Sequence, residues 1–418
     1  MAGSVLSLTF STMNSLTFSK GFKGANLSAI LNGPVFAINQ RIAQPLLTGA
    51  RKIVNPRAGI NAGDDRVPAP ALDDSRETAG ELLDVAAMVL LRDTPLAEID
   101  ANATAARIAE TLSQFPGLLT VPGAAGLWRY GPLDVEHRLS VLINQQVPLG
   151  WYMTGYWTRE RTGNYGAIAD AYNALQSGNV IEQQTFGFTG TPHTGRDLAS
   201  LVHQDQPFLI PLFVACQLLG ANAPLSGRFP AMANEAPFVT GGGALALQCA
   251  LATATESAMR LCWRAKYATM RERPERLWRE GVAGNLHPDF LKLGGWIVEE
   301  VGDYLPMIYA EGSPIHPDYP SGHACIAGVC AGILMAWFDD GPVPSLGIKS
   351  VHGEIRQMMW AMAIGRNWAG IHTRSSLLEG LRLGIRQARV HLATMKAQNP
   401  EPLRSTSFVD FDGLTVSV

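Results

Sequence analysis

The longest uncharged apolar segment of the sequence, residues 324–338, contains 15 residues. A membrane-spanning helix needs about 20 such residues, so this segment predicts a helix in the core of a soluble protein rather than a transmembrane span. Pro320 comes shortly before it, and Ser321 stands where an N-cap residue is expected.

Other segments from Arg66 onward also place apolar residues at helical spacings, and no run of strand periodicity or internal repeat stands out. Residues 146–200, rich in Gly, Tyr, Trp and Thr, predict a long irregular connection. The sequence therefore predicts an all-α fold: two packed helical-bundle halves in one domain, with long irregular connections. The expected helices cover residues 77–92, 103–115, 201–220, 241–279 (stopped or kinked near Pro274), 321–338, 351–364 and 377–395.

The first 63 residues differ from the rest because they contain no Asp or Glu and are mildly basic and rich in Ser. Such a composition is typical of an organelle targeting segment, and it equally fits a flexible arm that wraps a neighbouring subunit. We therefore expect residues 1–63 to form a targeting segment or oligomerisation arm and residues 64–418 to form the helical domain. The cell compartment is not determined by the sequence.

Composition excludes several classes of protein. With 47% hydrophobic residues the chain is not disordered throughout, and a net charge of −3 argues against a general nucleic-acid binder. The five cysteines include no CxxC pair and lie in apolar stretches, so buried thiols are expected rather than a disulfide framework.

Two cations stand seven residues apart at Lys266 and Arg273, just before Pro274. On a continuous helix that spacing places both side chains on one face. A solvated basic face is the ordinary explanation of such a pair, although the apolar surroundings of residues 261–270 make two cations there less ordinary.

Two further motifs carry polar chemistry. Ser321-Gly322-His323 opens the apolar helix, where free backbone N–H groups and the helix dipole favour an anion. Arg366 precedes His372 by six residues, and Gly370 offers a helix-ending turn that brings the histidine back toward the arginine. Each motif alone is weak, because a capping serine and structural histidines are common.

Taken together, the three motifs supply one lysine, two arginines, a hydroxyl, a helix N-terminus and two histidines. These donors suit a single tetrahedral or trigonal-bipyramidal oxyanion. Burying so many cations without an anion would be costly.

The pattern Lys-x6-Arg-Pro, Pro-Ser-Gly-His and Arg-x5-His resembles the signature of the vanadium-dependent haloperoxidase and type 2 phosphatidic-acid-phosphatase superfamily. Residues 310–323 and 195–205, and the tail from Phe411, are similar to the algal and cyanobacterial bromoperoxidases in particular. The resemblance covers roughly residues 190–418, and residues 1–150 match nothing that we recognise.

The resemblance implies a vanadate cofactor and residues that hold it. Lys266, Arg273 and Arg366 would bind the equatorial oxygens together with Ser321 and the backbone N–H of Gly322. Lys266 would in addition polarise the reacting oxygen. Structural calcium occurs in many algal relatives, but no Asp-rich loop here gives a strong calcium signal.

The resemblance also assigns single residues to the reaction. His372 would be the axial ligand of vanadium, and His323 the acid–base residue. Asp205 would pair with the distal arginine and fix the basic cluster. Trp263 and His316 would line the halide pocket, and a histidine rather than a phenylalanine at position 316 favours bromide.

One position departs from the family pattern. An aspartate usually stands four residues after the distal histidine, and here that position is Ser376. In the phosphatase branch this aspartate orients a nucleophilic histidine, so its absence disfavours phosphatase chemistry. Glu379 is a candidate substitute.

The implied activity is oxidation of bromide, and of iodide, by hydrogen peroxide to a hypohalite-type species that halogenates a small organic acceptor. The implied assembly is a homo-oligomer, at least a dimer. An acid phosphatase acting through the same anion cage is the first alternative, since phosphate and vanadate share a shape. A non-catalytic anion-binding protein is the second.

Overall fold

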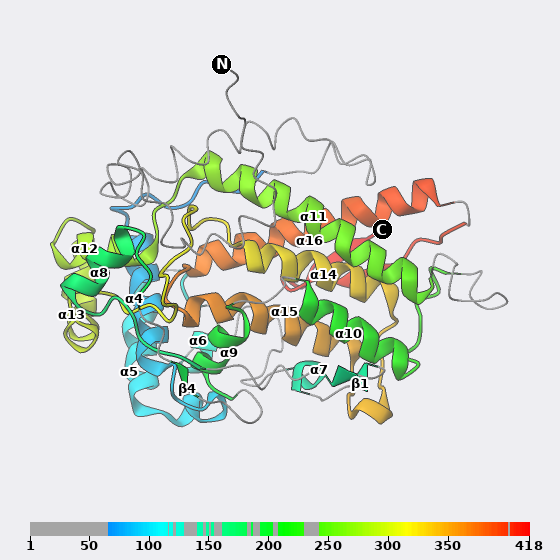
Figure 1. Ribbon diagram of the computed structural model, residues 1–418, viewed down its shortest axis with the longest axis horizontal. Coiled ribbons are helices and arrows are strands. Elements are labelled where there is room, and N and C mark those ends of the chain that lie inside the picture. Colours follow the sequence, from blue (N-terminus) through cyan, green and yellow to red (C-terminus); the bar gives the residue numbers. More distant parts are fainter. Residues whose placement is uncertain are drawn as a thin grey trace, which may run out of the picture.

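A computed structural model of the chain is shown in Figure 1. It describes residues 66–115, 117–119, 123–128, 140–144, 148–149, 152–153, 161–181, 185–186, 193–203, 208–229, 242–399 and 402–418. The expected targeting segment or arm at residues 1–63 lies outside the described residues, and the domain division stays a prediction.

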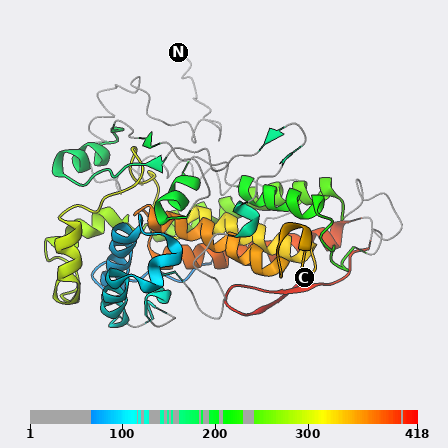
Figure 2. The ribbon, with the colours of Figure 1, turned by 90° about the horizontal axis from the view of Figure 1, so that it is seen from below.

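The larger group of helices forms a bundle that runs along the length of the molecule (Figures 1 and 2). Helix α14 packs most extensively against α16, and then against α15 and α11. The members of this bundle are α10 (Leu209–Gly220), α11 (Ala244–Thr269), α14 (Gly322–Trp337), α15 (Val351–Trp368) and α16 (Arg374–Gln398).

A second group of helices lies across one end of that bundle (Figures 1 and 2). Helix α4 is its centre, because it contacts the other three members and also reaches α15 and α16 of the larger bundle. This group consists of α4 (Arg76–Leu91), α5 (Ala103–Ser113), α12 (Pro274–Val282) and α13 (Asp289–Val301). The prediction of an all-α fold with two packed bundle halves is confirmed.

Shorter elements connect and cover the two groups. The helical ones are η1 (Leu96–Ala101), α6 (Ala125–Trp128), α7 (Val141–Asn144), α8 (Ala169–Gln176), α9 (Gly195–Leu201) and η4 (Pro344–Leu346). Three antiparallel two-stranded ribbons are formed by β1 (Pro148–Leu149) with β2 (Tyr152–Met153), β3 (Arg161–Thr162) with β4 (Thr185–Phe186), and β5 (Ser407–Val409) with β6 (Thr415–Ser417).

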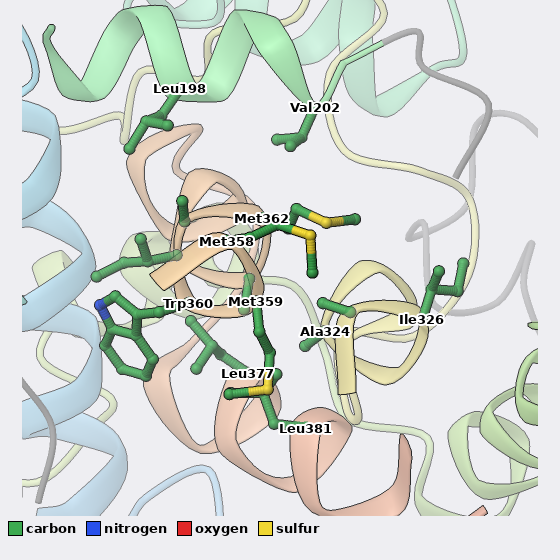
Figure 3. Close-up of a cluster of buried hydrophobic side chains, with 14 of the residues drawn as sticks. Leu198, Val202, Ala324, Ile326, Met358, Met359, Trp360, Met362, Leu377 and Leu381 are labelled. Atoms are coloured by element: carbon green, nitrogen blue, oxygen red, sulfur yellow. The ribbon is translucent and has the colours of Figure 1, made fainter. Parts of the chain in front are cut away.

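Helix α14 is the buried core helix that its composition predicts. Ser321 caps it, since the Ser321 side chain accepts a hydrogen bond from the backbone N–H of Ala324. Every residue of the helix except His323 is buried. Side chains of α9, α14, α15 and α16 meet in this core, including Leu198, Met358 and Leu381 (Figure 3).

The stop expected near Pro274 within residues 241–279 is present, because α11 ends at Thr269 and α12 begins at Pro274. Two other segments differ from expectation. The irregular connection expected over residues 146–200 contains α8 and the start of α9. Helix α13 lies in a segment that was not expected to be helical. None of the described helices combines the length and apolarity that crossing a lipid bilayer requires.

Candidate functional site

The three sequence motifs meet where the ends of four bundle helices come together. Lys266 lies in the last turn of α11, and Arg273 is the N-cap residue of α12. Arg366 lies in the last turn of α15, and His372 stands between α15 and α16. All four side chains are buried: Lys266 is 0% exposed, Arg273 and His372 are 2% exposed, and Arg366 is 5% exposed.

Lys266 and Arg273 do not share one helix face, which corrects the expectation from their spacing. The chain leaves α11 at Met270, whose backbone is left-handed with φ 55°. Arg273, the residue before Pro274, is extended because the proline ring disfavours the helical region there, so the break falls between the two cations. The turn nevertheless directs both side chains to the same short segment, residues 316–318.

Backbone carbonyls hold the first two cations in place. The Lys266 ammonium donates to the carbonyl oxygens of Pro317 at 2.8 Å and Asp318 at 2.9 Å. The Arg273 guanidinium donates through Nε to the carbonyl of His316 at 2.9 Å and through Nη1 to that of Ile371 at 2.7 Å. These neutral acceptors fix the two side chains without cancelling their charge.

Arg366 is held in a similar way. Its Nη1 donates to the carbonyl of Val202 at 2.7 Å and to the hydroxyl of Tyr309 at 2.9 Å. That hydroxyl donates in turn to the carbonyl of Ala199 at 2.9 Å. The Arg366 Nε is buried and has no hydrogen-bond partner among the described residues, so there it is a donor that a ligand could use.

Positive charge exceeds negative charge at this site. Burial first, and then the neighbouring arginines, lower the pKa of Lys266 to about 7. Burial lowers the pKa of Arg273 to about 10 and raises that of the adjacent Glu275 carboxyl to about 7. In the described part of the chain, none of the three cations is within ion-pair distance of a carboxylate. A bound anion would relieve this repulsion.

The N-terminus of α14 completes the site. The backbone N–H of Ser321 donates to the carbonyl of Ser376 at 2.8 Å, which fixes the start of the helix against α16. A Cβ atom at Gly322 would meet the Met259 side chain at 3.5 Å, an ordinary contact. Protein packing therefore does not account for a glycine here. His323, the next residue, is partly exposed, and its charge acts on His372.

His372 presents one nitrogen to the cations. Gly370, with φ 79°, ends the α15 region and turns the chain back, as its position predicts. The Nε2 atom of His372 lies 3.3 Å from Arg273 Nη1, while Nδ1 lies 2.5 Å from an oxygen of Asp318 and 3.0 Å from the hydroxyl of Ser376. Burial, followed by the neighbouring cations, holds the pKa of His372 well below its usual value, so the ring is neutral.

The substitute proposed from sequence is wrong. Glu379 does not contact His372, because its carboxylate pairs with Arg382 at 2.5 Å, one turn along α16. The carboxylate that orients the histidine is Asp318, which sequence reasoning missed. Its position two residues before Pro320, inside a motif already singled out, was the available signal.

Aromatic rings border the cations on one side. The Trp263 and His316 rings lie 5.2 Å apart between centroids, and Trp263 and Tyr267 lie 5.6 Å apart. Arg273 Nη2 lies 3.0 Å from His316 Nδ1. The Trp263 Nε1 atom is buried and has no hydrogen-bond partner within the part of the chain that the structure describes, so it is a candidate donor beside the charged site.

Asp205 lies outside the described residues, so its pairing with Arg366 remains untested. In the portion of the chain that the structure describes, no three His, Cys, Asp or Glu side chains are grouped as a metal site.

Ion pairs from α4 support the site from a segment in which no function was expected. Arg271 pairs with Glu81 at 2.7 Å, and Arg374 pairs with Asp84 at 2.7 Å. All four side chains are buried. Because Arg271 lies beside Arg273, and Arg374 lies two residues after His372, these pairs attach both ligand-bearing turns to one helix.

Comparison with known proteins gives consistent matches. Residues 246–399 match the family described as the VCPO second helical-bundle domain. The chain is 28% identical to the vanadium-dependent bromoperoxidase of Corallina pilulifera over 278 residues, 54% of this chain and 46% of that protein. It is also 28% identical to the vanadium-dependent bromoperoxidase of Ascophyllum nodosum over 382 residues, 76% of this chain and 67% of that protein.

The fold is shared with a solved structure. The homohexameric structure of the second vanadate-dependent bromoperoxidase (AnII) from Ascophyllum nodosum superposes with a TM-score of 0.71 at 20% sequence identity. The match covers 88% of this chain and 76% of that one. The chain spans about half the length of the Corallina relative that it matches. Residues 246–399, which carry the motifs, are thus similar to a VCPO helical-bundle domain, and the chain is similar in sequence and in fold to vanadium-dependent bromoperoxidases.

Proposed function

We propose that the protein is a vanadate-dependent haloperoxidase that oxidises bromide, and iodide, with hydrogen peroxide. The hypohalite-type product would halogenate a small organic acceptor. The observation that carries the proposal is the group of three buried cations, Lys266, Arg273 and Arg366, whose charges act on His372. Arg273 Nη1 lies 3.3 Å from His372 Nε2, and within the described residues none of the three cations has a carboxylate partner. The vanadium-dependent relatives make vanadate the expected anion.

The residues present fit this cofactor. Among the described residues, Arg366 Nε is a buried donor without a hydrogen-bond partner, and the packing around Gly322 would accept a Cβ, so it does not require the glycine. Lys266, Arg273, Arg366, Ser321 and the Gly322 N–H would hold the oxygens, and His372 Nε2 would bind the vanadium. Bound vanadate would supply a Lewis-acid centre that polarises the oxidant without changing its own oxidation state.

Side chains of the protein would then transfer protons and stabilise the charge that develops during the reaction. His323, partly exposed at the first turn of α14, would accept a proton from hydrogen peroxide on a ring nitrogen and return one to the departing oxygen. The Lys266 ammonium would stabilise negative charge that develops on the reacting oxygen. The surrounding cations would also attract halide into the same site.

Halide binding is assigned to the aromatic side of the site. The Nε1–H of Trp263, which has no hydrogen-bond partner among the described residues, can donate to a halide, and the His316 ring lies against the indole. Burial, together with Lys266 and Arg273, holds the pKa of His316 well below its usual value, so this ring adds no positive charge. We propose bromide rather than chloride as the substrate because a histidine lines the pocket.

The same cage could bind phosphate, which makes acid phosphatase activity the alternative. The decisive experiment compares two reactions of one preparation freed of bound anions. Bromination of a phenolic dye is measured with peroxide, bromide and added orthovanadate, and hydrolysis of a phenyl phosphate is measured without vanadate. We expect vanadate-dependent bromination and little hydrolysis.

Two variants sharpen this test. His323→Ala should lower bromination about 100-fold or more while vanadate binding is largely kept, because the acid–base group is lost and the cage is not. His287→Ala, a partly exposed histidine beside Asp289, is the matched control and should stay close to wild type. Hydrolysis without vanadate-dependent bromination would instead establish the phosphatase. Vanadate binding without either reaction would establish a non-catalytic anion-binding protein.

Assembly is also part of the proposal. The similar Ascophyllum structure is described as homohexameric. We propose that this chain forms a homo-oligomer of at least two copies, which the sedimentation velocity of the purified protein measures.

A further inference from the structure

We propose that Asp318 is the positioning residue that fixes the tautomer of His372, and that it supplies from the segment before α14 the carboxylate that the family pattern places at position 376. This inference rests on the proposed function, since it gives His372 a ligand role. It concerns how this chain makes the histidine ready for an anion-bound metal despite the serine at 376.

The contacts of the Asp318 side chain are complete. One carboxylate oxygen lies 2.5 Å from His372 Nδ1, and the other accepts a hydrogen bond from the Thr373 hydroxyl at 2.8 Å. Asp318 is fully buried and His372 is 2% exposed. A carboxylate held at both oxygens has little freedom to leave the imidazole, so it can define the orientation of the ring.

Ser376, the second neighbour of His372 Nδ1, indicates that this nitrogen carries the ring proton. The Ser376 hydroxyl donates to the backbone carbonyl of Asp318 at 2.9 Å, so its hydrogen is already used. Ser376 Oγ, 3.0 Å from His372 Nδ1, can therefore only accept there. With two acceptors at Nδ1, the ring proton belongs on that nitrogen.

The contact of the other ring nitrogen, His372 Nε2, supports the same assignment of the proton to Nδ1. Arg273 Nη1 lies 3.3 Å from His372 Nε2, and a guanidinium can donate but never accept. Nε2 therefore carries the lone pair, and it faces the cations. A carboxylate that fixes the far nitrogen of a ligating histidine sets its tautomer and raises its basicity.

Asp318 also links the histidine to the lysine of the site. Its backbone carbonyl accepts from both Lys266 Nζ and the Ser376 hydroxyl. One residue thus positions the metal-binding ring through its side chain and a cation through its backbone. The 3.0 Å separation of Ser376 Oγ from Nδ1 shows that position 376 is within reach of the same nitrogen.

This geometry makes an exchange experiment possible. Full-length protein freed of anions is prepared as wild type, Asp318→Ser, Asp318→Asn and the exchange variant Asp318→Ser with Ser376→Asp. Glu354→Gln is the matched control, because Glu354 is a buried carboxylate that accepts from Ser140 and Val141 on another part of the bundle. Each protein is titrated with orthovanadate by equilibrium dialysis, and the His372 tautomer is read by ¹⁵N NMR of histidine-labelled protein.

We expect Asp318→Ser to weaken vanadate binding about 10–100-fold and to abolish the single Nδ1–H tautomer. The exchange variant should regain most of the affinity and the tautomer, whereas Glu354→Gln should bind vanadate as wild type does. If Asp318→Ser does not fold, the isosteric Asp318→Asn carries the test, with about tenfold weaker binding expected from the lost charge.

Unchanged affinity and an unchanged tautomer in the Asp318 variants would overturn the inference. A second result would also overturn it: Asp318→Ser binds vanadate more weakly, the exchange variant does not restore the affinity, and the His372 tautomer stays unchanged in both. Asp318 would then act only through the stability of the fold. Neither vanadate affinity nor the tautomer requires turnover to be measured. A protein that does not oxidise halide would therefore contradict the proposed function, whereas vanadate binding and the tautomer alone test the role of Asp318.

Discussion

Lys266 is a single residue that lowers the stability of the fold while it prepares the site to bind an anion. Its ammonium is fully buried and is held by two backbone carbonyls rather than by a carboxylate. The resulting low pKa means that the folded protein releases this proton more readily than the unfolded chain does. Without an anion, the charged lysine therefore opposes folding.

Replacing Lys266 by Met should reveal this cost. The pKa of Lys266 in the folded state, about 7, lies below the usual lysine value of 10.5. Between these two pH values the unfolded chain keeps the proton that the folded state has lost, so wild-type stability should rise with pH. Between pH 7 and pH 9.5 the wild type should gain on the order of 2 kcal/mol relative to Lys266→Met. Urea unfolding at both pH values, in buffer free of phosphate and vanadate, measures the difference.

The same variant should bind vanadate at least tenfold more weakly, because a charge-assisted donor is lost. Equal pH slopes for the two proteins would show that Lys266 keeps an ordinary pKa in the folded state. Groups elsewhere that titrate in this range affect both proteins alike and cancel in the comparison.

Residue types and spacing predicted the cations and histidines of the cage, because each belongs to a short motif. They did not predict Asp318 as the partner of His372, since the two residues are 54 positions apart and meet only when α14 packs on α16. Glu379 was favoured because it is close in sequence, yet its neighbour Arg382, three residues along α16, takes its charge. Proximity along the chain was the wrong guide to proximity in space.

At the scale of the elements, close contact between α14 and α16 positions both histidine-bearing segments. Glycines permit this approach: a Cβ atom at Gly380 would lie 2.5 Å from the carbonyl oxygen of Ser321, and one at Gly332 would lie 2.5 Å from the Cβ atom of Ala388. The start of α14 therefore rests on the backbone of α16 directly after His372.

Gly384→Ala tests this contact. The added Cβ would collide with the carbonyl oxygen of Cys325 and lie 2.6 Å from the Val329 nitrogen, both of which belong to the backbone of α14. We expect a loss of about 1–3 kcal/mol in unfolding free energy, because backbone atoms cannot move aside as a side chain can.

Gly295→Ala is the matched control, since Gly295 lies within α13 and has open space where its Cβ would stand. It should gain about 0.5–1 kcal/mol from helix propensity. Urea denaturation midpoints compare the two. A neutral or stabilising Gly384→Ala would show that the helices can separate at no cost.

The long helices were predictable because their apolar spacing persists over many turns. The break between α11 and α12 lies near Pro274 as expected, but the residue at which α11 ends could not be foreseen, because the left-handed residue there is Met270 rather than a glycine. No residue type in that turn marks such a conformation in advance.

At the scale of the whole molecule, the site depends on both helical groups. Helix α4 supplies Glu81 and Asp84, which pair with buried arginines on the turns that carry Arg273 and His372. Removing one member of such a pair leaves an uncompensated buried charge, so these contacts join the two groups firmly. The motifs assigned no role to residues 1–150. Glu81 and Asp84 are two acidic residues within an apolar helix, and nothing in the sequence indicates which arginines they pair with.

The most direct test of the account is a crystal structure of the protein soaked with orthovanadate, with an anomalous map that locates vanadium. We predict one vanadium per chain, bonded to His372 Nε2, with its oxygens on the side chains of Lys266, Arg273 and Arg366. Vanadium at another place, or an empty cage under saturating vanadate, would contradict the claim that these buried cations exist to hold this anion.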